Sequence, residues 1–271
     1  MTGIRLQAMG DTSNPFGLWS NPPVKRGLAC LNFSGADARF SQVNRSGFPV
    51  AGRRAGSVLG MVDGIEDGLP QTHFVTDHMR GCDYLNCIEY EVAETESMTF
   101  IFAAKPENAN GTIPDINVST TRPIYIGYQL SSNHPVGMSV FVGGTGNVRL
   151  TAEFLVSGVS TTVNCTRPGY TGTQLNQLRM WAARIEAGVG MTIRDITAGT
   201  PAIFVANTNS RVLSGRNLRM GAGFSASGRS GFYCGSAHQV ALNTSEEDDQ
   251  AEFMATILKD EYSITGLVPG V

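Results

Sequence analysis

Charged side chains are scarce in this sequence, at 16% of 271 residues with a net charge of −3, against about 25% in an ordinary soluble domain. So few Glu and Lys residues disfavour a helical bundle. Since no excess of positive charge attracts nucleic acid, we expect no nucleic-acid partner. Lysine is limited to Lys25, Lys105 and Lys259. The other basic residues are arginines, which suit hydrogen-bonded contacts between chains, so we expect a chain that assembles with others.

Long apolar runs are missing as well. No stretch approaches the roughly 18 uninterrupted apolar residues of a membrane-spanning helix, so we expect no membrane insertion. Met1–Gly10 lacks the basic start and apolar stretch of a secretion signal. The five cysteines are an odd number, and without a secretion signal we expect free, buried thiols.

Glycine is abundant, with 32 residues, which suits many short strands joined by turns. Apolar and polar residues alternate over 147–156, the pattern of a strand with one buried and one wet face. Similar patterns predict strands at 98–104, 124–130, 138–142, 178–185, 190–196, 202–206, 217–221 and 233–242. Gly143-Gly-Thr-Gly146 predicts a hairpin loop between two of them. A strand about every ten residues favours an all-β sandwich or barrel.

Both ends of the chain differ from its middle. Residues 1–27 contain two turn-forming segments and few bulky apolar residues, so we expect an extended N-terminal arm, with an ordinary first strand and a long loop as the alternative. Over 245–262 a capping box, formed by Thr244 and Glu247, precedes an apolar face, which predicts one helix. We therefore divide the chain into the arm, 1–27, and a β-sandwich domain, 28–271.

The second half of the chain carries a recognisable order of elements. A strand with a tryptophan is followed by a glycine turn, a return strand, two further glycine-bounded strands and the acidic start of the helix: Asn176–Arg184, Gly188–Gly190, Met191–Gly199, Gly215–Gly221, Gly231–Leu242 and Ser245–Asp249. Over about residues 90–266, this order resembles the concanavalin A-like lectin/glucanase superfamily, in its laminin G-like and pentraxin-like branch.

The resemblance implies a jelly-roll sandwich of two antiparallel sheets with one short C-terminal helix. It also implies one of two settings, secreted eukaryotic proteins or structural proteins of bacteriophage particles. The missing secretion signal, the few lysines, the odd cysteine count and the N-terminal arm favour the second setting.

Glu89, Glu91 and Glu94 are the strongest candidates for catalysis. Glucanases of the resembled superfamily carry an E-x-D-x-x-E run, whose first and last glutamates act as nucleophile and acid/base. The spacing here matches, but Glu replaces Asp in the middle and a bulge is needed to align the third carboxylate. Stacking tryptophans are also few, and Trp181 is on an expected core strand. We therefore favour a solvated strand edge without catalysis, and a glycoside hydrolase using these three residues is the alternative.

Two segments contain metal-capable side chains. The first holds His73, Asp77, His78, Cys82, Asp83 and Cys87, at spacings that differ from those of structural zinc sites. The second is Asp63–Gly68, whose carboxylates suit Ca²⁺ but do not follow EF-hand spacing. We expect plain loops, no metal and no cofactor, with zinc and calcium as the respective alternatives.

Ligand binding by a sandwich is expected at the loops between its strands. Three loops offer guanidinium, aromatic or amide groups, which suit a neutral or acidic glycan and equally a protein contact. The candidate residues are Arg167 and Tyr170 in the loop 165–172, Asn207, Asn209 and Arg211 in the loop 207–211, and Arg229 in the loop 225–230.

Together, these features predict a non-enzymatic structural protein of a bacteriophage virion, made in the host cytoplasm and placed in the tail or a tail fibre. Its partners would be sister chains, other virion proteins and a bacterial surface glycan bound by the rim loops. A capsid or baseplate decoration or scaffold protein without a receptor role is one alternative. The glycoside hydrolase and a cellular lectin-like module are the others.

Overall fold

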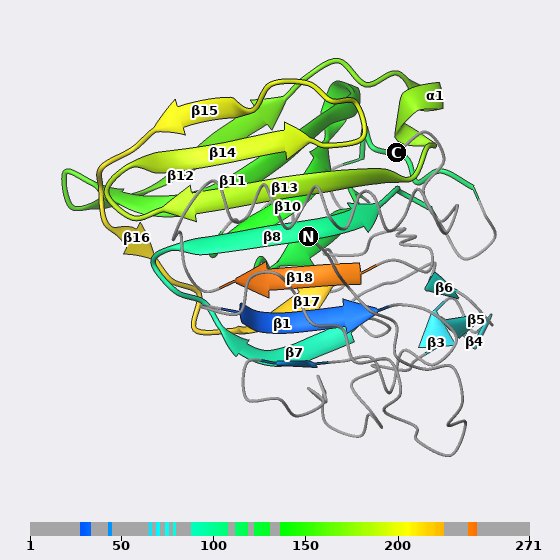
Figure 1. Cartoon of the computed structure of the whole chain (residues 1–271), viewed down its shortest axis with the longest axis horizontal. Coiled ribbons are helices and arrows are strands. Elements are labelled where there is room, and N and C mark those ends of the chain that lie inside the picture. The colour runs from blue at the N-terminus through cyan, green and yellow to red at the C-terminus, as the bar shows by residue number, and fades with distance from the viewer. Residues whose placement is uncertain are drawn as a thin grey trace, which may run out of the picture.

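Two antiparallel β-sheets form the body of the protein. The computed structural model describes residues 28–33, 43–44, 65–66, 69–70, 74–75, 78–79, 88–107, 112–118, 122–130, 136–224 and 238–242. One sheet has the strand order β15-β14-β13-β8-β18-β1-β2, and the other has the order β12-β11-β10-β9-β17-β7, with β16 pairing β11. Figure 1 shows the first sheet in front of the second. The predicted all-β sandwich is confirmed.

Most strands are short, and the chain passes repeatedly from one sheet to the other. The first sheet contains β1 (Leu28–Phe33), β2 (Val43–Asn44), β8 (Met98–Ala104), β13 (Arg179–Glu186), β14 (Gly190–Asp195), β15 (Ile203–Ala206) and β18 (His238–Leu242). The second contains β7 (Ile88–Ala93), β9 (Ile124–Gly127), β10 (Ser139–Gly143), β11 (Asn147–Val156), β12 (Val159–Arg167), β16 (Arg211–Val212) and β17 (Asn217–Met220). Smaller elements are the strand pairs β3 (Ile65–Glu66) with β4 (Leu69–Pro70) and β5 (Phe74–Val75) with β6 (His78–Met79), and the helical turns η2 (Gly144–Gly146) and α1 (Gly172–Leu175).

Strands are present at all the predicted positions, within a few residues of the expected bounds, although residues 233–237 of the last predicted strand lie outside the described residues. The predicted hairpin loop at 143–146 joins β10 to β11, which pair in antiparallel register. One expectation about burial was wrong. Strands β8, β9 and β10 were each predicted to have one wet face, but every residue of all three is buried. The expected arm, 1–27, and the expected helix, 245–262, lie outside the described residues.

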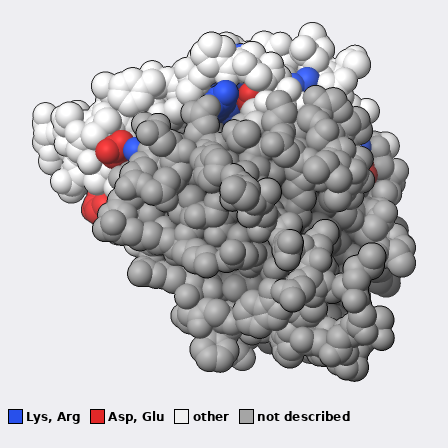
Figure 2. Space-filling view, in the orientation of Figure 1, with Lys and Arg blue, Asp and Glu red and all other residues white. Residues whose placement is uncertain are grey.

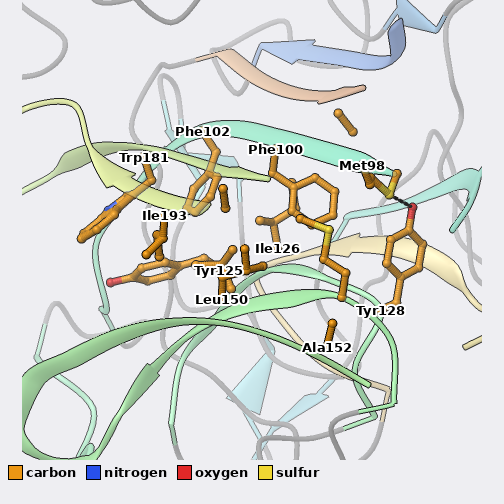
Figure 3. Close-up of a cluster of buried hydrophobic side chains, with 14 of the residues drawn as sticks. Met98, Phe100, Phe102, Tyr125, Ile126, Tyr128, Leu150, Ala152, Trp181 and Ile193 are labelled. Carbon is orange, nitrogen blue, oxygen red and sulfur yellow. Dashed lines mark hydrogen bonds between the residues drawn. The ribbon is translucent and has the colours of Figure 1, made fainter. Parts of the chain in front are cut away.

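The hydrophobic core fills the space between the sheets. Phe100, Phe102 and Trp181 point into it from the first sheet, and Tyr125 and Tyr128 point into it from the second (Figure 3). Burying a large apolar side chain contributes about 1.5–3 kcal/mol. The prediction that Trp181 lies on a core strand is confirmed, since its side chain is almost fully buried.

Strand direction gives the sandwich two ends. At one end, which we call the α1 end, η2 joins β10 to β11, β12 runs into the loop before α1, and β14 finishes at Asp195. At the other, the β16 end, lie the turn between β11 and β12, the turn between β13 and β14, and β16 itself. Figure 1 places α1 and β16 on opposite sides of the molecule.

Within the residues that the structure describes, no helix combines the length and the apolar character needed to cross a membrane.

Candidate functional site

Tyr170 lies at the α1 end, in the loop between β12 and α1. Its backbone N–H donates to the carbonyl of Gly146, 3.1 Å away. Its ring meets that of Trp181 edge to face, with 5.5 Å between the ring centroids. The ring is partly buried, so one part is held by the core and another part faces solvent. The loop thus presents an aromatic surface in a fixed orientation.

Asp195 fixes the Tyr170 hydroxyl. Its carboxylate is fully buried at the end of β14, and it accepts hydrogen bonds from the Tyr170 hydroxyl at 2.7 Å, the Arg179 guanidinium at 2.8 Å and the Ala198 N–H at 2.9 Å. Three donors satisfy a carboxylate that would otherwise be costly to bury. Asp195 therefore anchors the tyrosine and the arginine together.

One guanidinium group lies over the Tyr170 ring, and a second contacts the tyrosine side chain. The Arg179 group lies 5.2 Å from the centroid of the Tyr170 ring, within the range of a cation–π contact. Arg167 donates to the carbonyl of Pro201 at 3.2 Å. We call Arg167, Tyr170, Arg179 and Asp195 the Tyr170 rim. Its two arginines and one carboxylate give it a net positive charge.

Burial raises the pKa of the Tyr170 hydroxyl above its usual value of about 10, and the hydrogen bond to the Asp195 carboxylate raises it further. The hydroxyl is therefore a proton donor at physiological pH and holds the ring in place. The rim offers an aromatic face and guanidinium donors, which are groups that bind a polar ligand.

The other predicted binding residues lie elsewhere. Asn207 and Asn209 are at the β16 end, where the Asn207 side-chain oxygen accepts from the N–H and the amide of Asn209 at 2.9 and 3.0 Å. Arg211 is in β16, and its side chain is completely buried. The five described candidates thus separate into two ends of the sandwich. Arg229 lies outside the described residues.

Glu94 is the partner of Arg211. Their side chains form an ion pair that is almost completely buried, and Glu94 also accepts from the backbone N–H groups of Met138 at 2.5 Å and Ser214 at 2.8 Å. Three segments of the chain are joined at this carboxylate. A buried group with all these donors has no route to a substrate, so its role is structural.

Glu89 is likewise held within the second sheet. It accepts from Arg219 at 2.9 Å and from Asn217 at 3.2 Å, both on the neighbouring strand β17. Glu89 and Glu94 are buried, which corrects the expectation of a solvated strand edge for these two residues. The Glu91 side chain is outside the described part. Neither described carboxylate is placed to contact a glycosidic bond, as a glycoside hydrolase requires.

Most residues of the two predicted metal segments lie outside the described part of the chain. The described residues of these segments are those of β3, β5 and β6. Among the residues with described positions, no three His, Cys, Asp or Glu side chains are grouped closely enough to hold a metal ion.

Cys165 is a free, buried thiol, as predicted for the cysteines. Its sulfur lies 3.2 Å from the Ile203 carbonyl, to which it donates, and burial raises its pKa to about 11. Because the thiolate is the reactive form, we expect native Cys165 to resist iodoacetamide at pH 8 and to be labelled once the chain is unfolded. Peptide mass spectrometry measures both states, and rapid native labelling would contradict this placement.

Comparison with known proteins gives a match in structure alone. No family model and no curated protein matches the sequence. Solved structures that resemble it include receptor-binding domains of botulinum neurotoxins. The domain of botulinum neurotoxin D has a TM-score of 0.51 at 9% identity, and that of the mosaic serotype C/D has a TM-score of 0.53 at 9% identity.

In both comparisons the match covers 88% of this chain and about half of the neurotoxin domain, 53% for serotype D and 52% for the mosaic. At this identity the similarity establishes the fold alone. It agrees with the sandwich described above.

Proposed function

We propose that this protein is a non-enzymatic glycan-binding domain and that the Tyr170 rim is its binding site. The observation that carries the proposal is the fixed, partly exposed ring of Tyr170, with the Arg179 guanidinium over the ring and Arg167 beside its side chain. The apolar face of a sugar ring packs against an aromatic side chain, while its hydroxyl or carboxylate groups accept hydrogen bonds from arginine. A preformed site also avoids the entropic cost of ordering side chains on binding.

The buried state of Glu89 and Glu94 supports binding over hydrolysis. The structural neighbours are receptor-binding domains of neurotoxins, which is compatible with a binding role.

The setting that we propose is a bacteriophage particle, with the protein in the tail or a tail fibre and a bacterial surface glycan as the receptor. The resemblance to phage-borne concanavalin A-like domains supports this setting, together with the few lysines and the free Cys165 thiol. A capsid or baseplate decoration protein is the competing assignment within the same particle.

A glycan array probed with the full chain tests the proposal. We expect at least one bacterial glycan to bind, and Tyr170→Ala to weaken that binding by about tenfold or more, or about 1.4 kcal/mol, because the stacking surface is lost. Tyr170→Phe keeps the ring and should lose less.

Val189→Ala, at the β16 end, is the matched control for a folded chain and should bind like the wild type. Binding that is unchanged by Tyr170→Ala would remove the rim from consideration. No binding to any bacterial glycan would favour the decoration protein.

A further inference from the structure

One long side of the sandwich is formed by β12 and β15, the terminal strands of the two sheets. The two strands lie one above the other, and the Cys165 sulfur in β12 donates to the Ile203 carbonyl in β15. Among the described strands each lies at the edge of its sheet, so each has one row of backbone N–H and C=O groups that no described strand pairs with. We call this surface the β12–β15 side.

Among the residues that the structure describes, β12 and β15 carry no charged side chain except Arg167 at the end of β12. The sequence contains none between Glu153 and Arg167, which includes all of β12 up to its last residue, and none between Asp195 and Arg211, which includes β15. Natural sheets commonly block edge strands with charged side chains. Strand β7, at the opposite edge of the second sheet, carries Glu89 and Glu91. Much of the described surface at the top of Figure 2, where β14 and β15 lie in Figure 1, is uncharged.

The hydrophobic core also reaches the surface here. Val163 from β12 and Ile203 and Val205 from β15 pack against the core but are only partly buried. Phe204 in β15 is 55% exposed and Val159 in β12 is 65% exposed. Within the described part of the chain, this apolar strip between two edge strands is incompletely covered.

We propose that the β12–β15 side is a dimer interface, occupied by a second copy of this chain. A two-fold axis perpendicular to the sheets would pair β12 with the partner's β12 and β15 with the partner's β15, both antiparallel, and would continue each sheet across the interface. A partner must offer two stacked, uncharged edges with an apolar strip between them. This chain has that surface, and a charged partner surface would lose its hydration without gaining an ion pair.

This inference does not depend on the proposed glycan site. The Tyr170 rim is at the α1 end and shares only Arg167, the last residue of β12, with the interface along the side. A chain that binds no glycan can still form the dimer, and a monomer can still bind glycan. The two failures are therefore distinguishable.

The native mass of the full chain tests the proposal. Sedimentation equilibrium over a dilution series should give twice the chain mass of 28.9 kDa. Phe204→Lys in β15 and Thr162→Lys in β12 place a charge at the interface on exposed positions, and each should raise the dimer dissociation constant about 100-fold or more. Val118→Lys, at an exposed apolar position in the segment between β8 and β9, is the matched control and should leave the dimer unchanged.

Hydrogen exchange locates the contact. Backbone N–H groups of β12 and β15 should be protected at high protein concentration and lose that protection on dilution, whereas those of β10 should not change. A monomeric wild type, an assembly of three or more copies, or a dimer that both lysine variants leave intact would overturn the proposal. The proposal would also be overturned if Val118→Lys raised the dimer dissociation constant as much as the two interface variants do. Thermal melting shows whether each variant is folded. If Phe204→Lys does not fold, Thr162→Lys still tests the interface.

Discussion

Replacing Glu94 with alanine is expected to lower the free energy of unfolding by about 3–5 kcal/mol. The change leaves the Arg211 guanidinium buried without its carboxylate. It also removes the acceptor for the N–H groups of Met138 and Ser214, and buried donors without acceptors are costly. Chemical denaturation of the wild type and the variant measures the difference.

Glu153→Ala provides the control. Glu153 is a partly exposed glutamate that accepts from Ser160, and its loss should change the free energy of unfolding by less than about 1 kcal/mol. The double variant Glu94→Leu/Arg211→Met should be more stable than Glu94→Ala, because no unpaired charge stays in the interior. A Glu94→Ala protein as stable as Glu153→Ala would show that the ion pair does not hold these three segments together.

Gly146→Ala is expected to destabilise the protein by about 3 kcal/mol and to abolish glycan binding. Gly146 has a backbone φ of +72°, and an added Cβ would overlap the carbonyl oxygen of Tyr170. Because the Cβ is fixed to the backbone of residue 146 and meets a backbone oxygen, the loop must move, and the Tyr170 ring moves with it. Denaturation and glycan titration measure the two effects.

Gly188→Ala separates backbone strain from this steric overlap. Gly188 also has a positive φ, +75°, but an added Cβ meets nothing within 4 Å. It should lose only the strain contribution of about 1 kcal/mol and keep glycan binding. If Gly146→Ala bound glycan as well as Gly188→Ala does, the position of the Tyr170 loop would not matter for binding.

Local patterns in the sequence were sufficient for most strands. In β11 the position of a residue on the pleat decides whether its side chain is buried. This applies to the alternating residues Val148, Leu150, Ala152 and Phe154. Strand β12 was not predicted, since its residues are mostly polar and exposed and show little alternation. The burial of both faces of β8 depends on what packs over the sheet, and a single strand does not encode that.

The candidate site was predicted less completely, because its pairings join distant parts of the chain. Arg211 was expected at a loop surface, but its partner Glu94 is 117 residues away in the sequence, and no local pattern links the two. Tyr170 was identified from its loop, whereas Arg179 and Asp195 were not. A signal for Asp195 was present. It follows Met191 and Ile193 at the same period of two, which places an acid on the inward face of β14.

Binding without cleavage is tested most directly by recovering the glycan after contact with the protein. Immobilised wild-type chain and its Tyr170→Ala variant are incubated with bacterial surface polysaccharide, and the retained fraction is eluted and sized by mass spectrometry. We predict that the wild type retains polysaccharide of unchanged chain length and that Tyr170→Ala retains at least about tenfold less. Shortened chains with new reducing ends, or equal retention by the variant, would contradict a non-enzymatic glycan site at the Tyr170 rim.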